Sequence, residues 1–264
     1  MQFREHRVGS RLLVVAHDLE NAALRLGLPE RVLAAVPGPG GRAGTTLLEL
    51  PGDTRRIHLR PVRHGGWLGP AWGRWILGLR RPQHELRITA ALTAAGAPVP
   101  RAALLLGQRH FGPFWSATLG TVNEDGAIDG ASFLASQPSP ERLLRAAAAA
   151  ASATRRFHDV GGRHADLQIR NLLIHERASH VEAIVIDLDR ARLGQPPNPR
   201  RRMAELMRLY RSLVKRQLLE TVGSRGLARF LASYTAGDRA LRTALLQRLP
   251  AEQRRLAIHR LGYR

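Results

Sequence analysis

The chain has 264 residues, of which 41 are Lys or Arg and 21 are Asp or Glu, so its formal charge is +20. Hydrophobic residues make up 44% of it, which is the composition of a folded rather than a disordered chain. The absence of cysteine excludes disulfides, zinc–thiolate sites, iron–sulfur clusters and thiol nucleophiles.

The charge predicts a polyanionic partner, although arginine in place of lysine among many Ala and Gly is also what a GC-rich genome encodes. Aromatic residues are only 5% and are not interleaved with a basic stripe, so we do not expect a nucleic-acid partner. No segment reaches the roughly 20 apolar residues of a membrane span, and the first residues lack a signal peptide's apolar stretch. We therefore expect a cytoplasmic chain that can bind an anionic membrane surface.

The first half of the chain is predicted to be rich in strands. Two short β-rich runs, 45–50 and 55–62, flank a Pro-Gly-Asp turn and predict a hairpin that ends at Pro61. Apolar residues at helical spacing predict a helix over 83–95, which Gly96 ends. Further strands are predicted over 102–106 and 114–122.

The second half is predicted to be mainly helical. It follows an acidic, turn-rich stretch over 123–130. We therefore predict an α+β chain of two lobes, a β-rich N-lobe with one helix over 1–122 and a larger helical C-lobe over 123–264. The elements predicted in the C-lobe are a helix over 140–158, a hairpin of 172–174 with 181–186, an amphipathic helix over 200–219 and further helix beyond.

Residues 163–192 contain the side chains that phosphoryl transfer needs. Asp166 lies in a loop, Asn171 follows five residues later, and Asp187 ends an apolar strand. In such a site one carboxylate accepts the proton of the attacking hydroxyl, while an amide oxygen and a second carboxylate hold Mg²⁺. We therefore predict Asp166 as the catalytic base, and Asn171 and Asp187 as ligands of Mg²⁺.

The spacing matches the kinase pattern H-R-D-x-x-x-x-N followed by a D-F-G-type Asp. Ala165 replaces the Arg of that pattern, and Leu188-Asp189 replaces Phe-Gly. We expect His164 to support the loop rather than to titrate. Asp189, Arg190 and Arg192 either contact an anionic acceptor or hold the segment after Asp187 in place.

A kinase-like site also needs groups upstream that bind the phosphates of ATP. The only lysine, Lys215, lies after Asp187, so the strand cation must be an arginine: Arg60 is the first candidate and Arg63 the second. Glu85, on the predicted helix, is the expected partner of that cation. A Gly-rich turn would cover the phosphates through Gly41, Arg42, Gly44 and Thr45.

Several runs of the sequence carry a family resemblance, spread from about residue 41 to 216: GRAGTTLLEL, LRPVRHGG, AAGAPVPR, HADLQIRNLLI, VIDLDRAR and MAELMRLYRSLVKR. On these runs the chain resembles the bacterial lipopolysaccharide kinases of the Kdo/heptose group, within the protein-kinase-like superfamily. The I-D-x-D-R-x-R run separates this group from ordinary protein kinases. Members usually have Asn where Gln168 stands and an aromatic where Leu188 stands, and an Arg at the position of Arg60 is expected.

The resemblance is closest to members that phosphorylate 3-deoxy-D-manno-octulosonic acid (Kdo). It implies ATP- and Mg²⁺-dependent phosphorylation of a Kdo hydroxyl on a lipid A precursor, in lipopolysaccharide inner-core biosynthesis. It also implies peripheral attachment to the cytoplasmic face of the inner membrane. The charge of +20 fits these anionic partners independently.

Other functions stay open on the sequence alone. The acceptor could be another anionic sugar or small molecule, or the chain could be a pseudokinase that binds an anionic partner without turnover. A soluble amino-sugar phosphotransferase is disfavoured by the arginine excess, because such enzymes bind cationic acceptors. About a dozen residues separate Asp187 from the next predicted helix, which is short for a regulated activation loop and favours a small or lipid acceptor over a protein.

Overall fold

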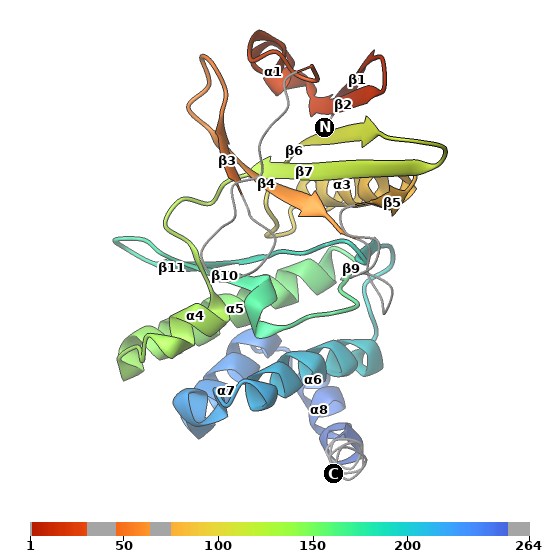
Figure 1. Cartoon of the computed structure of the whole chain (residues 1–264). Helices are drawn as coiled ribbons and strands as arrows, with labels where there is room; N and C mark the ends of the chain where they lie inside the picture. The colour runs from red at the N-terminus through yellow and green to blue at the C-terminus, as the bar shows by residue number, and fades with distance from the viewer. Residues whose placement is uncertain (1, 31–45, 64–74, 253–264) are drawn as a thin grey trace. The chain divides into compact units, whose positions relative to one another are not determined.

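The computed structural model describes residues 2–30, 46–63 and 75–252 (Figure 1). The chain divides into two compact units. The first unit consists of Met1–Ala94 with Pro100–Glu124, and the second consists of Ala95–Val99 with Asp125–Arg264. Each unit is described below by itself.

The first unit is built on an antiparallel sheet whose strands follow the order β1-β2-β6-β7-β4-β3 among the described residues. Strand β7 pairs with β6 along one edge, and with β4 and then the short β5 along the other. The strands are β1 (Phe3–Val8), β2 (Arg11–Ala16), β3 (Thr46–Glu49), β4 (Arg56–Val62), β5 (Ile76–Leu77), β6 (Ala102–Arg109) and β7 (Phe114–Val122).

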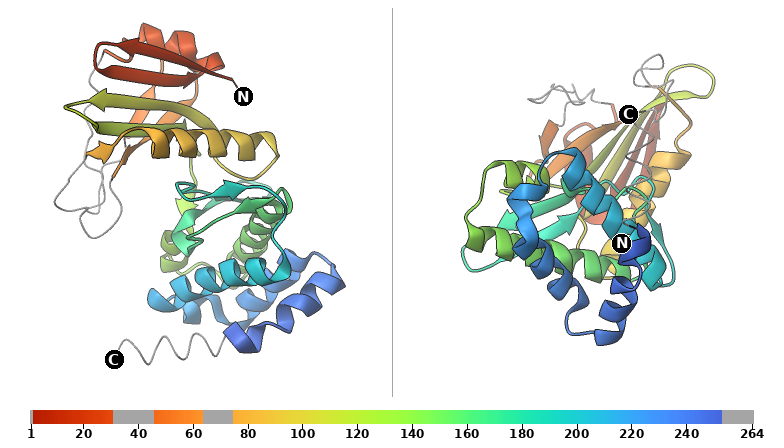
Figure 2. Two further views of the ribbon diagram at one scale, coloured as in Figure 1. Left: turned by 90° about the vertical axis from the view of Figure 1, so that its right-hand side faces the viewer. Right: turned by 90° about the horizontal axis from the view of Figure 1, so that it is seen from below.

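Helices pack on both faces of this sheet (Figures 1 and 2). Helix α1 (Glu20–Arg25) contributes to a buried cluster with alternate residues of β4, such as Ile57 and Leu59. Helix α3 (Arg80–Ala94) packs Leu86 and Ala90 on the opposite face. Successive side chains of a strand point to opposite faces of the sheet, so alternate residues of β4 pack on the side of α1 and on the side of α3.

The structure confirms the predicted hairpin and the helix after it. Strands β3 and β4 are antiparallel neighbours, and α3 begins three residues earlier than the predicted helix. Gly96, with a φ of 80°, follows the helix in the left-handed conformation that glycine adopts easily. The expected end of the strand at Pro61 is wrong: β4 continues to Val62, because the fixed φ of proline is compatible with extended backbone.

The second unit is mainly helical. Its long helix α5 (Pro140–Asp159) packs against α7 (Leu219–Thr235) and against the hairpin of β10 (Leu172–Glu176) and β11 (Val181–Val185). Both the long helix and the hairpin agree with the prediction. Figure 2 shows these helices with α4 (Gly130–Ala135), α6 (Pro199–Lys215) and α8 (Arg239–Leu246).

Local sequence explains where the helices of the second unit begin. Ser139 and Asn198 each cap a helix through a side-chain oxygen, and each is followed by a proline at the first helical position. Asp129 and Asp238 cap α4 and α8 in the same way. The amphipathic helix α6 ends at Lys215, four residues earlier than predicted.

Three short strands complete the second unit beside the predicted site. Strand β8 (Ile128–Asp129) adds to the edge of β10, and β9 (Gly162–Arg163) pairs with β12 (Arg192–Leu193). Across the described ranges 2–30, 46–63 and 75–252, no helix is long and apolar enough to cross a membrane.

Candidate active site

The predicted catalytic loop begins at a buried histidine, His164, which is 2% exposed. Its Nδ1 accepts the backbone N–H of Asp166 at 3.2 Å, so the proton of the ring lies on Nε2. That Nε2–H donates to the backbone oxygen of Ile186 at 3.0 Å, directly before Asp187. His164 therefore supports the loop, as expected, and joins it to the predicted metal-binding segment.

Asn171 makes a second connection between the same segments. Its Nδ2 donates to the backbone oxygen of Asp166 at 2.8 Å, and its own backbone oxygen accepts the N–H of Ile186 at 2.9 Å. The amide Oδ1 is then the atom left to accept a cation. Hydrogen bonds thus bring together the predicted base, the predicted amide ligand and the strand end that carries Asp187.

Asp187 is exposed and has a φ of 62°. A non-glycine residue in this left-handed region is uncommon, although Asp tolerates it better than most, and such residues concentrate at functional sites. The next residue, Leu188, is buried and 3% exposed. The reversal at Asp187 lets its side chain stay in solvent while its successor enters the core.

Asp166 is exposed, and its Oδ2 accepts a hydrogen bond from Nε2 of Gln168 at 2.7 Å. This contact fixes the plane of the carboxylate and leaves Oδ1 facing away from that donor. Gln168 stands where the resemblance led us to expect Asn. Its longer side chain reaches back two residues to orient the predicted base.

A buried polar network under the loop was not predicted from the sequence. Glu205 of α6, 6% exposed, accepts the backbone N–H of His164 at 2.9 Å through Oε2. The same oxygen is 3.1 Å from Nε2 of His158, a fully buried residue of α5. The other ring nitrogen of His158 lies 2.6 Å from the hydroxyl of Tyr234 in α7.

This network joins three helices to the first residue of the loop. Burial raises the pKa of Tyr234 to about 12, so its hydroxyl keeps its proton and can donate to His158. The middle of the loop is held in a similar way, because Ser212 of α6 accepts the N–H of Ile169 at 2.9 Å. Helix α6 therefore supports the loop at two points.

The segment after Asp187 is tied to the entrance of the loop. Strand β12 pairs with β9, and the N–H of Gly194 donates to the oxygen of Gly161 at 3.1 Å. Gly161 has a φ of 91°, and a Cβ there would come within 1.7 Å of Gly194 O. Only glycine fits at this crossing. Arg192 lies in β12, so its backbone takes part in this pairing, while the roles of the Asp189, Arg190 and Arg192 side chains stay predictions.

The predicted phosphate-binding pair also forms, in the first unit. Arg60 lies opposite Leu119, whose side chain packs under α3, so Arg60 shares the face that α3 covers. There Arg60 Nη2 donates to Oε1 of the buried Glu85. The pKa of the neighbouring His58 is lowered mainly by burial and to a smaller extent by the positive charge of Arg60. Arg63 is exposed, and its backbone oxygen accepts a bond from Arg81.

The residues proposed to cover the phosphates, Gly41, Arg42, Gly44 and Thr45, lie outside the described residues. Their proposed roles therefore stay predictions from the sequence.

A model of the lipopolysaccharide kinase (Kdo/WaaP) family matches residues 71–234, which is more than half of the chain. The chain belongs to this family. It is also similar to a solved structure described as WaaP in complex with acyl carrier protein, with 23% sequence identity and a TM-score of 0.60. That match covers 92% of this chain and 97% of the other. The comparison with curated proteins gave no match.

Membership of the lipopolysaccharide kinase family makes the chain a phosphotransferase that uses ATP. The match to WaaP confirms the predicted α+β fold of the protein-kinase type, with a β-rich N-terminal part and a helical C-terminal part. The described residues contain no group of three or more His, Cys, Asp or Glu that could hold a metal by themselves. Asn171 and Asp187 nevertheless fit Mg²⁺, which is bound in kinases by few protein oxygens together with phosphates.

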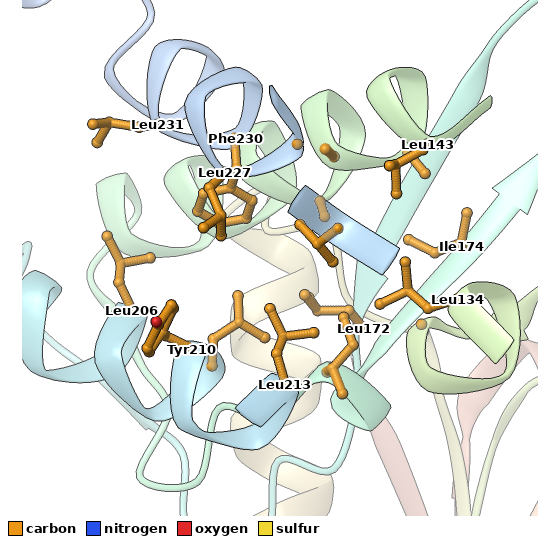
Figure 3. Close-up of a pocket in the computed structure, with 18 of the residues that line it drawn as sticks. Leu134, Leu143, Leu172, Ile174, Leu206, Tyr210, Leu213, Leu227, Phe230 and Leu231 are labelled. Carbon is orange, nitrogen blue, oxygen red and sulfur yellow. The ribbon is translucent and has the colours of Figure 1, made fainter. Parts of the chain in front are cut away.

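This lipopolysaccharide kinase also contains an apolar cavity of about 190 Å³ inside the second unit. Figure 3 shows leucines of α4, α5, α6 and α7 around it, with Tyr210 as the labelled residue that carries a polar atom. Ile169 and Leu172, at the end of the catalytic loop, also line it. The cavity is separate from the exposed Asp166 and Asp187, yet it shares its wall with their loop.

Proposed function

We propose that this lipopolysaccharide kinase transfers the γ-phosphoryl group of ATP to a Kdo hydroxyl on a lipid A precursor. The observation that carries the proposal is the set of hydrogen bonds that joins Asp166, Asn171 and the strand end at Asp187. The family match supports a lipopolysaccharide acceptor. The overall resemblance of the sequence to members that phosphorylate Kdo supports Kdo as the acceptor within that class.

In the proposed reaction the acceptor hydroxyl attacks the γ-phosphorus, its new O–P bond replaces the bond to the ADP oxygen, and its proton passes to the carboxylate of Asp166. Gln168 holds that carboxylate through Oδ2, which leaves Oδ1 to take the proton of the acceptor hydroxyl. Asn171 Oδ1 and Asp187 would hold Mg²⁺, which neutralises charge on the phosphates when it is bound.

Arg60 would bind the phosphates of ATP, with Glu85 fixing its guanidinium. An arginine stays charged at every accessible pH and can bind two phosphate oxygens at once, so it can replace the usual strand lysine. Backbone N–H groups of Gly41, Gly44 and Thr45, with the side chain of Arg42, would cover the phosphates. The product would be ADP and a phosphorylated Kdo.

The experiment is transfer of labelled phosphate from ATP and Mg²⁺ to a Kdo-bearing lipid A precursor. Asp166→Asn should lower kcat by about 10²–10⁴-fold, as expected for loss of a general base. Glu141→Gln removes an exposed carboxylate of α5 and should leave kcat unchanged. Turnover of a different anionic sugar in place of Kdo would overturn the acceptor, and ATP binding without any transfer would indicate a pseudokinase.

The proposed location is the anionic cytoplasmic face of the inner membrane, where such an acceptor is made. The chain's charge of +20 supports it, because anionic lipids attract basic surfaces. Fractionation of cells that express the chain should recover it with the inner membrane and release it at high salt. Recovery in the soluble fraction at low salt would contradict this location.

The cavity supports a second partner for the same enzyme. WaaP was solved with an acyl carrier protein, and the cavity here is lined by apolar side chains suited to one acyl chain. Acylated acyl carrier protein should raise the Tm of the chain more than the unacylated form does. Ala147→Leu, which narrows the cavity, should abolish that difference, whereas Ala148→Leu on the same helix, outside the lining, should keep it.

A further inference from the structure

One end of the sheet in the first unit carries a cluster of exposed apolar side chains, here called the aromatic tip. It consists of the exposed Val8, Trp75, Leu77 and Phe111 together with the partly buried Phe114. The turn between β1 and β2, the turn between β6 and β7, and strand β5 all reach this end (Figure 1). The residues therefore come from three separate parts of the sequence.

Ring contacts order the aromatic tip. Trp75 packs edge-on against Phe111 with centroids 5.4 Å apart, and Phe111 lies 4.8 Å from Phe114. Backbone bonds hold the turns in place: Gly78 N–H donates to Pro113 O at 2.9 Å, and Arg109 N–H donates to Ser10 O at 2.8 Å. The tip is a built surface rather than a set of loose side chains.

The aromatic tip is more exposed than apolar residues of this size usually are. Leu77 is 55% exposed, Phe111 54%, Val8 44% and Trp75 39%. Among the described residues, these four are half of the large hydrophobic residues that are exposed. The others, Leu24, Leu47, Ile128 and Leu246, lie on four different elements. A contiguous exposed patch of this kind marks an interaction surface.

Arginines lie close in sequence to each part of the aromatic tip. The segments 7–11, 75–81 and 108–115 contain five arginines and neither Asp nor Glu. Arg11 and Arg109 donate to neutral oxygens, Gln108 Oε1 and Gly112 O, while Arg7 pairs with Glu5 at 3.2 Å. The five segment arginines are Arg7, Arg11, Arg80, Arg81 and Arg109.

We propose that the aromatic tip inserts into the interface of an anionic lipid bilayer while these arginines bind its headgroups. Trp and Phe favour the headgroup region of membranes, and arginine adds attraction to anionic lipid, roughly fivefold in affinity per residue. This deepens the proposed function, since it names the surface that would place the enzyme at its lipid-linked acceptor.

A bilayer fits this surface better than a protein partner does. Val8 lies beside the turn between β1 and β2, Phe111 lies in the turn between β6 and β7, and both side chains are exposed at these turns. The surplus of positive charge favours a continuous anionic plane. Aromatic rings with flanking arginines are also the composition of interfacial membrane anchors.

The test is flotation of the purified full-length chain with vesicles, without ATP or acceptor. Mixed phosphatidylglycerol–phosphatidylcholine vesicles should bind it at least about tenfold more tightly than pure phosphatidylcholine vesicles. Leu77→Ser with Phe111→Ser should weaken binding to the anionic vesicles by about tenfold or more. Leu24→Ser, which removes a side chain of similar exposure from α1, should not.

A second pair of variants tests the contribution of the arginines near the aromatic tip. Arg80→Gln with Arg109→Gln should weaken binding to the anionic vesicles, whereas Arg225→Gln with Arg229→Gln, an equal loss of charge on α7, should have a smaller effect. Phe111→Ser alone, at the exposed turn, is a milder variant should the double one fail to fold.

Equal binding by the Phe111→Ser chain and the unaltered chain would overturn the proposal, and so would an equal loss in Leu24→Ser. Failure to bind either vesicle would also overturn it and leave a protein as the partner of the tip. The kinase proposal is independent of these results. Phosphate transfer to a soluble Kdo acceptor should be unchanged by Phe111→Ser, since the tip contains no residue of the proposed active site.

Discussion

Glu205 Oε2 accepts the backbone N–H of His164 at 2.9 Å, so a buried carboxylate of α6 holds the first residue of the catalytic loop. The same oxygen meets Nε2 of His158. The position of Asp166 thus depends on a group that never needs to contact ATP or the acceptor. Glu205 acts as a positioning residue.

Glu205→Ala should destabilise the chain and slow turnover. It leaves the N–H of His164 and the ring of His158 without their acceptor, and each orphaned buried group costs about 1–3 kcal/mol. We expect the free energy of unfolding in urea to fall by about 2–4 kcal/mol. We also expect kcat to fall while the KM for ATP changes little.

Glu205→Gln is the matched control for this prediction. Its amide oxygen can still accept both bonds, so it should restore most of the stability and of kcat. A Gln variant as impaired as the Ala variant would mean that the negative charge, rather than the acceptor geometry, carries the effect.

Arg60→Met should abolish tight ATP binding. The pair with Glu85 fixes the guanidinium on the face that α3 covers, where the proposal places the ATP phosphates. We expect turnover to fall by about 10²-fold or more, in line with loss of a preorganised charge at transferring phosphate. Titration calorimetry with ATP and Mg²⁺ measures the loss directly.

Arg63→Met tests the second candidate for the same role. Arg63 is exposed directly after β4, and its backbone rather than its side chain bonds Arg81. The Arg63→Met variant should bind ATP as tightly as the unaltered chain does. A larger loss in Arg63→Met than in Arg60→Met would exchange the two assignments.

Gly161→Ala should separate the entrance of the catalytic loop from the segment after Asp187. A Cβ at Gly161 would overlap Gly194 O, and the φ of 91° is strained for alanine. We expect a loss of at least about 2 kcal/mol in the free energy of unfolding, with a lower kcat. Gly194→Ala is the control, because its Cβ would meet only Arg163 Nη2 at 3.5 Å, an ordinary contact. Similar losses in both variants would contradict this explanation.

Stability at low pH should depend on Asp53, in the turn between β3 and β4. Hydrogen bonds from the Arg55 side chain lower the pKa of Asp53 from 3.8 to about 2. Because the folded pKa lies below the unfolded one, this contribution is fully present above about pH 4 and is lost as the pH falls toward 2.

Asp53→Asn should therefore lower the free energy of unfolding by about 1 kcal/mol at neutral pH, since solvent screens such a pair. Its stability should also fall less steeply than that of the unaltered chain between about pH 4 and pH 2. Thermal unfolding across this range measures both effects. Glu5→Gln, which removes the exposed partner of Arg7, should leave the slope unchanged. An unaltered slope in Asp53→Asn would contradict the prediction.

Much of the fold follows from local sequence patterns. The helices α3, α5 and α6 and both central hairpins were predicted because apolar spacing and turn residues agree with the tertiary structure there. Strands β1 and β2 were not predicted. Four consecutive charged or polar residues, Arg4–Arg7, fill the middle of β1, which is an edge strand with little burial, so its sequence carries no hydrophobic period.

Helix α6 shows why the positioning residues were missed. Its apolar stripe predicted one buried side, and Glu205 and Ser212 fell outside that stripe as apparent solvent positions. Both are buried, because the catalytic loop covers the second face of the helix. The available signal was the spacing of Arg202, Glu205 and Ser212 on one helical face. Pairing them with His158 needs the tertiary structure, since 47 residues separate Glu205 from that histidine.

The arginine at position 60 also alters how this enzyme can be addressed chemically. Reagents that label kinases by acylating the strand lysine need a nucleophilic amine, and a guanidinium that stays protonated offers none. The single lysine of the chain, Lys215, lies at the end of α6 in the other unit. Nucleotide probes that acylate an amine should therefore not label this kinase at its ATP site in a cell extract. Covalent inhibitors built on the same chemistry should not inactivate it.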